Sequence, residues 1–170
     1  MIRPIVLYGA DVLESPSEPV LNITDSEVQL IKDMVETMYK APGVGLAAPQ
    51  IGVGKRIMVT DPTAGEKQNR LITIINPVIA EAEGEQYEEE GCLSIPGFSA
   101  EVRRPQRVVL KGVDINGKDV AVEGADLLAR AFCHELDHLN GRFFLDHLSF
   151  IKRDMIRRRI RRLMKQGKWE

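Results

Sequence analysis

The strongest periodic pattern in the chain lies in residues 24–40. Thr24 and Glu27 have the spacing of a capping box, in which each side chain pairs with a backbone N–H of the first helical turn. Behind them, apolar residues recur three and four positions apart, as on one face of a helix: Val28, Ile31, Met34, Val35 and Met38. A proline and a glycine at 42–43 end the pattern. We therefore predict a helix over 24–40 whose role is core packing.

Short runs rich in β-branched residues predict strands through the middle of the chain. The predicted strands cover 56–60, 71–76, 78–80, 102–113 and 120–122. Asn116 and Gly117 favour a tight hairpin turn between the last two. The proline-containing segment 1–22 predicts an extended arm that holds at most one short strand.

Helix-forming residues without proline run over 125–139 and contain the pattern His-Glu-x-x-His. His134 and His138 lie four positions apart, so on a helix they share a face and can bind one metal ion. Glu135 is then placed to take a proton from a water at that ion. Gly141 is predicted to end the helix. The pattern uses two of the three histidines in the chain, which favours a metal site over a solvated surface pair.

The spacing of the histidines leaves the third ligand of such a site open. In proteases of the metzincin type this ligand lies six residues past the second histidine, but Phe144 occupies that position and cannot bind a metal. His147 lies three residues further on, beyond the predicted end of the helix. Cys92 is the other candidate, although a free cysteine is more often an inert buried thiol.

Length and composition favour a single folded domain with a substantial core. The chain has 170 residues, of which 44% are hydrophobic and 28% charged, and these are ordinary values for a soluble protein. No apolar run is long enough to span a bilayer, and the first residues lack the features of a signal peptide. Two cysteines do not make a disulfide framework. The expected compartment is the reducing cytoplasm.

Charge is distributed unevenly along the chain. Residues 152–170 hold nine basic and two acidic residues, a net charge of +7, so residues 1–151 carry −9 of the total of −2. Apolar residues near helical spacing accompany these bases: Leu148, Ile151, Met155, Ile160 and Leu163. The segment 149–170 therefore predicts a basic C-terminal helix, which is either solvated on the surface or in contact with an anionic partner.

Two other segments have unusual compositions. Residues 43–52 are small and uncharged and include one amide, that of Gln50. Such a segment is either a tight buried loop or a backbone edge that lines a cleft, because glycine lets a backbone approach another group closely. Residues 88–90 are three glutamates, which usually form a solvated face, and the polarity changes abruptly at Gly91 and Cys92.

Three separated stretches together resemble the signature motifs of peptide deformylases, in the right order and at typical separations. The stretches are Gly43-Val44-Gly45-Leu46-Ala47-Ala48-Pro49-Gln50, Glu90-Gly91-Cys92-Leu93-Ser94 and His134-Glu135-Leu136-Asp137-His138. The resemblance spans nearly the whole chain, including a helix before the first motif and one after the last. It implies a metal-dependent hydrolase that removes the N-formyl group from the N-terminal methionine of newly made polypeptides and releases formate.

The resemblance also implies the metal site. Cys92, His134 and His138 are expected to be the three protein ligands of one divalent ion, with a water in the fourth position. Three protein ligands and one open position are typical of a catalytic metal site rather than a structural one. The family precedent is Fe²⁺, and a Cys-His-His site also accepts Zn²⁺, Ni²⁺ or Co²⁺, which isolated protein could hold instead.

By the same resemblance, Glu135 is expected to be the general base that takes the water proton and then protonates the departing amine. The side-chain amide of Gln50 and the backbone N–H of Leu93 resemble the donors that hold the formyl oxygen as it becomes an anion.

The remaining expectations from the family concern the substrate chain. A backbone edge would pair with the substrate as an added strand, and its expected residues are Gly43, Gly45 and Gly91. The methionine side chain would occupy an apolar pocket, with Arg130 contributing its aliphatic stem or standing at the rim. The expected lining residues are Val44, Leu127, Arg130 and Ala131, and ordinary core packing is the alternative for each.

Three further positions bear on the site. Glu90 and Arg104 are expected either to pair and brace the Cys92 loop or to be unrelated surface charges. Ser99 stands where some family members carry a basic residue that meets the far end of the substrate, and a serine cannot supply that charge. Cys133 is expected to be a packed thiol on another face of the helix.

The predicted fold is α+β, with small antiparallel β-sheets around a central metal-binding helix, an N-terminal helix and a basic C-terminal helix. Residues 1–148 would form the metal-dependent catalytic domain, and residues 149–170 would pack on it as the basic helix. For this family the natural anionic partner of that helix is ribosomal RNA near the peptide exit tunnel. Two rival functions remain, a metal-dependent endopeptidase that uses His147 or a distant acid as third ligand, and a ribosome-associated binding protein with a relic site.

Overall fold

The computed structural model describes the whole chain, residues 1–170. Seven strands form two antiparallel sheets, one with the order β1-β2-β3-β6-β7 and one made of β4 and β5. The strands are β1 Gly45–Ala47, β2 Ile57–Thr60, β3 Ile72–Glu83, β4 Gln86–Cys92, β5 Ile95–Arg104, β6 Arg107–Val113 and β7 Asp119–Ala125. Both β1 and β4 leave one edge unpaired, because each lies at the end of its sheet.

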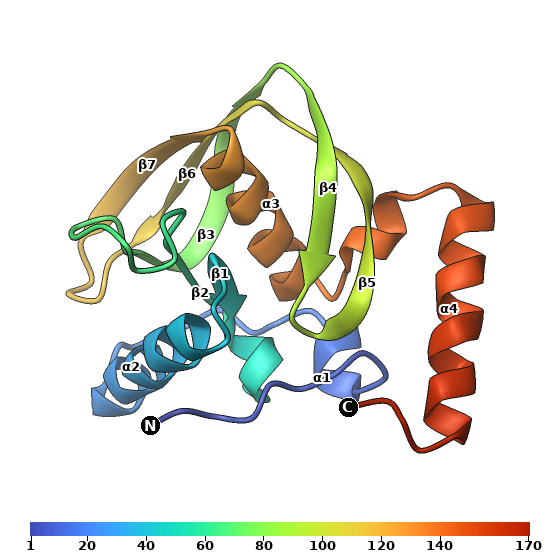
Figure 1. Cartoon of the computed structure of the whole chain (residues 1–170). Coiled ribbons are helices and arrows are strands. Elements are labelled where there is room, and N and C mark those ends of the chain that lie inside the picture. Colours follow the sequence, from blue (N-terminus) through green and yellow to red (C-terminus); the bar gives the residue numbers. More distant parts are fainter.

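Four α-helices and two short 3₁₀ helices complete the chain. They are α1 Asp11–Glu14, α2 Asp25–Lys40, η1 Ala48–Ile51, α3 Leu127–Leu139, η2 Phe144–His147 and α4 Phe150–Lys165. Helix α3 lies between the five-stranded sheet and the β4–β5 hairpin, while α4 stands at the side beyond β5 (Figure 1). The predicted α+β fold, with antiparallel sheets around a central helix, is confirmed.

The N-terminal helix forms as its sequence predicts. The backbone N–H of Ser26 donates to Thr24 Oγ1 at 3.3 Å, and Glu27 Oε2 accepts from the Thr24 N–H at 3.0 Å, which completes the capping box. Met34 and Met38 on the inner face of α2 are fully buried against β1, β2 and β3. This packing fixes the segment between α2 and β1, which borders the pocket described below.

Helix α3 is held in place by its sheet-facing side. Phe132, Leu136 and Leu139 pack against a cluster that includes Met58 and Leu110. Because side chains four apart share a face of a helix, His134 and His138 lie on another side of α3, away from this cluster. The sheet contact therefore orients both imidazoles.

The ends of α3 differ slightly from the predicted range of 125–139. The helix begins at Leu127 because Ala125 is still paired in β7 and Asp126 has a φ of 56°. The helix ends at Leu139, and Gly141 follows with a φ of 73°, so the predicted stop at this glycine is confirmed.

The prediction of separate strands at 71–76 and 78–80 is wrong, because β3 continues through both. The strand accommodates Pro77 at a register shift between Ile75 and Val78, where Asn76 has a φ of 55°. A bulge of this kind needs no ladder hydrogen bond from the proline nitrogen. The Asn76 side chain bonds both the N–H and the carbonyl of Val20, at 2.8 and 2.9 Å, and so ties the N-terminal arm to the sheet.

The N-terminal arm contains one short helix, α1, which the sequence did not predict, and one isolated bridge from Glu18 to Lys55 instead of a strand. Tyr8 lies in this arm and bonds two distant parts of the chain. Its N–H donates to the carbonyl of Ser94 at 2.8 Å, and its own carbonyl accepts from Trp169 Nε1 at 2.9 Å.

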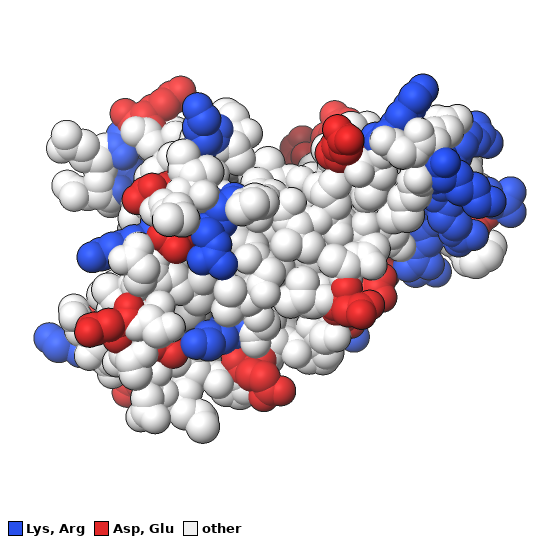
Figure 2. All heavy atoms as spheres, turned by 90° about the horizontal axis from the view of Figure 1, so that it is seen from below, with Lys and Arg blue, Asp and Glu red and all other residues white.

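The predicted C-terminal helix is confirmed as α4. Ile160 is fully buried and packs in a cluster with Leu13, Ile95 and Phe143. The opposite side of α4 is exposed, and basic side chains gather over it (Figure 2). None of the helices combines the length and the apolar character that crossing a membrane requires.

The contact between β7 and α3 leads to a first prediction. A Cβ atom at Gly124 would lie 2.8 Å from both Leu128 Cγ and Phe132 Cε2. Gly124→Ala should therefore lower the free energy of unfolding by about 1–3 kcal/mol, the usual effect of overpacking a dense core. Urea unfolding followed by circular dichroism measures the change.

Gly54→Ala is the matched control. A Cβ atom there would meet nothing closer than Val12 Cγ2 at 4.0 Å. Its stability should stay within about 0.5 kcal/mol of the wild type. Equal stabilities of the two variants would show that the spacing between β7 and α3 is not set by Gly124.

Candidate active site

The ligand atoms of Cys92, His134 and His138 converge at one point. Nε2 of His138 lies 3.3 Å from Cys92 Sγ and 3.2 Å from His134 Nε2, and the three atoms lie within 4.8 Å of one another. Around a tetrahedral first-row ion, nitrogen and sulfur ligands lie about 3.3–3.6 Å apart, given bond lengths of about 2.0–2.3 Å. These three side chains could therefore hold one metal ion with little movement.

The fold brings these atoms together from two elements. His134 and His138 lie one turn apart on α3, whereas Cys92 is the last residue of β4. A register shift between Gly91 and Cys92 separates the Cys92–Ile95 pair from the regular β4–β5 ladder. The cysteine therefore sits at the closed end of the hairpin, where that end approaches α3.

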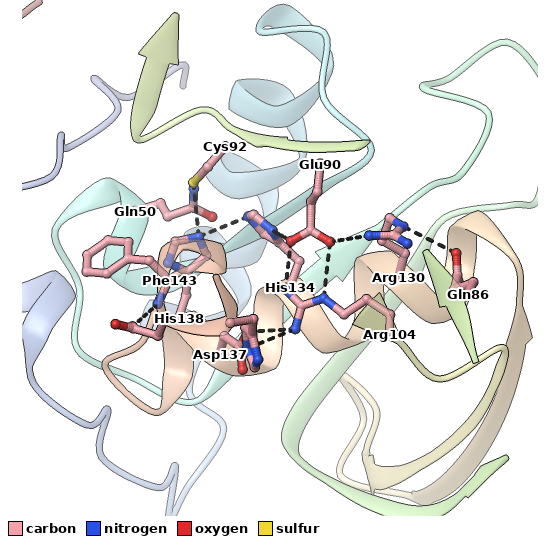
Figure 3. Close-up of polar contacts among 12 residues, drawn as sticks. Gln50, Gln86, Glu90, Cys92, Arg104, Arg130, His134, Asp137, His138 and Phe143 are labelled. Carbon is pink, nitrogen blue, oxygen red and sulfur yellow. Dashed lines mark hydrogen bonds and ion pairs between the residues drawn. The ribbon is translucent and has the colours of Figure 1, made fainter. Parts of the chain in front are cut away.

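Glu90 connects the cysteine strand to the histidine helix (Figure 3). One carboxylate oxygen lies 2.7 Å from His134 Nδ1 and accepts from Arg104 Nη2 at 2.6 Å. The other accepts from Arg104 Nε at 3.1 Å and from Arg130 Nη1 at 2.9 Å. The expected pairing of Glu90 with Arg104 is confirmed, and the contacts of Glu90 with His134 and Arg130 are additional.

These contacts set the charge of Glu90. Burial alone would raise the pKa of this carboxyl, but the hydrogen bonds from His134 and Arg104 outweigh burial and hold its pKa well below the usual range. A carboxylate behind a ligand histidine fixes the ring orientation and makes the opposite nitrogen a better ligand. Nε2 of His134, which faces Cys92 and His138, is that nitrogen.

The two histidines differ in their preferred charge. Burial is the main cause that lowers the pKa of His138, and the neighbouring His134 lowers it further, so its neutral form is favoured. Burial acts the same way on His134, but the charges of Glu135 and Cys92 outweigh it and raise the pKa of His134. A metal ion at the Nε2 atoms would compete with that proton, since ligand binding requires the neutral imidazole.

Glu135 lies beside the side chains of Cys92, His134 and His138 and is buried. Burial raises the pKa of its carboxyl to about 7, and the charge of His134 acts in the opposite direction. Its Oε1 atom is buried and has no hydrogen-bond partner in the protein. A Cβ atom at residue 45 would overlap Oε2, so Gly45 is required for the β1 backbone to lie this close to Glu135.

Gln50 directs its amide group toward the same place. Its Oε1 accepts from the N–H of Ala47 at 3.0 Å. Its Nε2 donates to Ser94 Oγ at 3.2 Å and lies 3.9 Å from Cys92 Sγ. The amide orientation is therefore fixed, with the NH₂ group toward the cysteine.

A pocket of about 360 Å³ opens in front of these groups. The free edges of β1 and β4 border it on two sides. It is lined by Pro42, Gly43, Val44, Gly45, Gln50, Glu89, Glu90, Gly91, Cys92, Leu93, Leu127, Arg130, Ala131, His134 and Glu135. All residues that were expected to bind substrate or take part in catalysis line this one pocket, and of the expected metal ligands only His138 is not among its lining residues.

The alternatives left open by the sequence lie elsewhere. His147 Nε2 is 2.8 Å from Asp137 Oδ2 and 3.2 Å from Arg104 Nη1, and it is not grouped with the other two histidines. Cys133 is buried in the sheet-facing cluster, where burial raises the pKa of its thiol to about 11. Cys92 is therefore the residue that joins His134 and His138.

Sequence reasoning missed most of the partners of Glu90. Arg130 lies four residues before His134, so a shared helix face was the one available signal for this residue. The contacts of Arg104 with Asp137 at 2.8 Å and of Arg130 Nε with Gln86 at 3.2 Å join distant segments, and no spacing in the sequence predicts them.

The sequence and the fold both match known proteins of one family. The family model described as polypeptide deformylase matches residues 2–154. A peptide deformylase of Acidobacterium capsulatum is 46% identical over 99% of both chains, and one of Halothermothrix orenii is 52% identical over 87% of this chain and 94% of its own. Among solved structures, the peptide deformylase from Legionella pneumophila superimposes with a TM-score of 0.90 at 42% identity, covering 100% of this chain and 99% of its own. The chain belongs to the polypeptide deformylase family.

Proposed function

We propose that the pocket in front of Cys92, His134 and His138 is where this chain, a metal-dependent peptide deformylase, removes the N-formyl group of newly made polypeptides. The observation that carries the proposal is the convergence of three ligand atoms within 4.8 Å at a pocket bordered by two free strand edges. A metal site next to unpaired backbone fits a reaction on the end of an extended peptide.

Cys92, His134 and His138 would hold the divalent ion, which we propose to be Fe²⁺, with Zn²⁺, Ni²⁺ or Co²⁺ as substitutes. Their one sulfur and two nitrogen donors suit any of these metals. When bound, such an ion supplies the Lewis acidity that turns water into a nucleophile near neutral pH. Glu90 would keep the His134 ring in its binding orientation through the contact at Nδ1.

Glu135 would act as the general base and then as the general acid. Its Oε1 has no protein partner, so it is free to take a proton from the attacking water. The same carboxyl would pass that proton to the amine as the formyl C–N bond breaks. The products are formate and a polypeptide with a free amino terminus.

Two donors would stabilise the formyl oxygen as it gains negative charge. One is Nε2 of Gln50, whose direction is fixed by the bond of Oε1 to Ala47. The other is the backbone N–H of Leu93, which has no backbone acceptor in the protein. Donors that are oriented before the reaction lower the barrier without reorganisation.

The substrate would lie between the two free strand edges. Its backbone would pair with Gly43–Gly45 on one side and with Gly91 on the other, as an added strand. The methionine side chain would lie on Val44, Leu127 and Ala131 and along the stem of Arg130. Nε and Nη1 of Arg130 are bonded to Gln86 and Glu90, which holds the side chain so that its aliphatic stem would meet the methionine.

The C-terminal helix would serve binding rather than chemistry. We propose that residues 1–148 carry the reaction and that residues 149–170, which dock through Ile160, contact ribosomal RNA near the exit tunnel. The exposed bases of α4 supply the charge for such a contact. Formylated chains emerge at that place, and the proposed compartment is therefore the cytoplasm.

The release of a free amine from formyl-Met-Ala-Ser tests the proposed function. The chain should produce formate and Met-Ala-Ser. An endopeptidase would cleave inside longer peptides and leave the formyl group in place. A relic site would release nothing.

Replacing the proposed base gives a second prediction. Glu135→Gln keeps the size and polarity of the side chain but removes its ability to accept a proton. The rate of formate release should fall by about 10²–10⁴-fold, the usual contribution of a positioned general base. Metal content, measured by atomic emission, should stay close to one ion per chain. A variant that keeps wild-type activity would contradict the role of Glu135.

The proposed sulfur ligand gives a third prediction. Cys92→Ala leaves only two histidines at the metal site, so both bound metal and activity should be lost. Cys133→Ala is the matched control, because this thiol lies in the sheet-facing cluster and should leave metal content unchanged. If Cys92→Ala retained a full complement of metal, the ligand set would be wrong.

The proposed ribosome contact gives a fourth prediction. Arg161, Arg162 and Lys165 are exposed on α4, and replacing all three with glutamine removes charge without touching the buried Ile160. Affinity for ribosomes in co-sedimentation should fall by about tenfold or more, with a weaker salt dependence, because fewer phosphate counterions are released. Activity on formyl-Met-Ala-Ser should not change.

The control removes three exposed lysines from other surfaces. Lys32, Lys67 and Lys118 are exposed and have no ion-pair partner, and their replacement by glutamine lowers the net charge equally. This variant should bind ribosomes as the wild type does. Equal losses in the two triple variants would mean that overall charge, and not α4, governs the contact.

A further inference from the structure

Gln86, the first residue of β4, is bonded through both ends of its side-chain amide. Nε2 donates to the carbonyls of Pro105 and Asp126, at 3.0 and 2.8 Å. Oε1 accepts from Nε of Arg130 at 3.2 Å (Figure 3). The partners lie between β5 and β6, between β7 and α3, and on α3 itself. Gln86 does not line the pocket, but Arg130 and the residue that follows Asp126 do.

The junction between β7 and α3 requires support of this kind. Asp126 has a φ of 56° and a ψ of −124°, a conformation that residues with a Cβ atom rarely adopt. Such a backbone persists only where its surroundings fix it. The N–H of Asp126 donates to the carbonyl of Gln106 at 3.0 Å, and its carbonyl accepts from the N–H of Arg130 at 3.1 Å and from the amide of Gln86. Gln86 therefore helps to fix the direction in which the chain enters α3 at Leu127.

Leu127 and Arg130 form the part of the pocket wall that lies next to this junction. Leu127 is 46% exposed, so core packing contributes little to its position and the backbone of the junction must set it. Arg130 is buried, and its guanidinium is held by Glu90 through Nη1 and by Gln86 through Nε. Removal of the Gln86 amide would free one side of that guanidinium and one bond of the junction, and both changes would loosen the same wall.

We propose that Gln86 is a positioning residue that fixes the shape of the pocket for the first side chain of the substrate. This step rests on the proposed function, in which Leu127 and the stem of Arg130 meet the methionine. A wall that is held in place accepts the unbranched methionine side chain and disfavours a branched one of similar volume, such as leucine, because a close-packed site penalises a change of shape. Gln86 acts through Leu127 and Arg130 and has no bond to the proposed metal ligands.

Gln86→Leu tests the proposal on the metal-loaded enzyme, because the new side chain is similar in size but can make none of the bonds of the amide. The substrates are formyl-Met-Ala-Ser and formyl-Leu-Ala-Ser. The ratio of their kcat/KM values, methionine over leucine, should fall by about fivefold or more from the wild-type ratio, within the range that the shape of an apolar pocket supplies. A rise in KM for formyl-Met-Ala-Ser should account for most of the change, with kcat within about threefold of the wild type, because a loosened wall weakens binding without moving the reacting groups. Metal content should not change.

Gln86→Asn provides a milder test that does not depend on how well Gln86→Leu folds. It keeps the amide group but is one methylene shorter, so the amide cannot reach Arg130 and Asp126 together. The ratio of kcat/KM values should fall in this variant as well. Urea unfolding of both variants shows how much of each effect comes from stability, because a general loss of folded enzyme lowers turnover of the two peptides equally and leaves the ratio unchanged.

Gln106→Leu is the matched control. Gln106 is half-buried, as Gln86 is, and its side chain bonds the same junction, but it does so through the Asp126 carboxylate and makes no bond to Arg130. The backbone carbonyl that holds the Asp126 N–H remains in this variant, so the ratio should stay within about twofold of the wild type. The proposal is overturned if the folded Gln86 variants keep the wild-type ratio, or if Gln106→Leu lowers it as much as they do. Absence of turnover of both formyl peptides by the wild type would instead refute the proposed function itself.

Discussion

The carboxylate of Glu90 is the interaction on which the site depends. It lies at the end of the cysteine strand, accepts hydrogen bonds from two arginines and lies against the ring of a histidine on α3. A buried carboxylate is strongly disfavoured unless it is fully paired, and here the partners come from two other elements, β5 and α3. The same contacts that make its burial tolerable therefore hold β4, β5 and α3 at one fixed separation.

The fixed separation of β4, β5 and α3 determines the position of the free strand edges around the pocket. With α3 fixed against both sheets, the free edges of β1 and β4 face one another across a gap that neither sheet fills. Free edges usually invite uncontrolled pairing with other chains. In this fold they border a pocket of about 360 Å³ that Cys92 and His134 also line, which suits a single extended segment. The proposed metal ligands and the strand edges would thus suit the same kind of molecule, the end of a peptide.

The sequence predicted those parts of the site that depend on short spacings. The His134, Glu135 and His138 pattern, the capping box at Thr24 and the stop at Gly141 are each local, so geometry follows directly from residue order. Cys92 required a comparison of distant motifs, because nothing in its neighbourhood shows which face of which helix it meets. The roles of Gln50 and Leu93 depended on the same resemblance.

The missed features are those in which one residue overrides a local pattern. The continuity of β3 through Pro77 depends on the backbone of Asn76, which has a positive φ and side-chain bonds to the N-terminal arm. Direct contacts in the network around Glu90 join residues up to 44 positions apart, as between Glu90 and His134. Neither periodicity nor composition predicts these long-range contacts. A run of three glutamates is typical of a solvated surface, not of a buried network.

Tyr8 links both ends of the chain to residues at the pocket. Its carbonyl receives the Trp169 indole, its N–H reaches Ser94, and the hydroxyl of Ser94 accepts from the amide of Gln50. Through this one residue of the N-terminal arm, both termini are connected to the amide of Gln50, which lines the pocket. Trimming either end of the chain would remove part of this connection, so residues at both termini contribute to the support of the Gln50 amide.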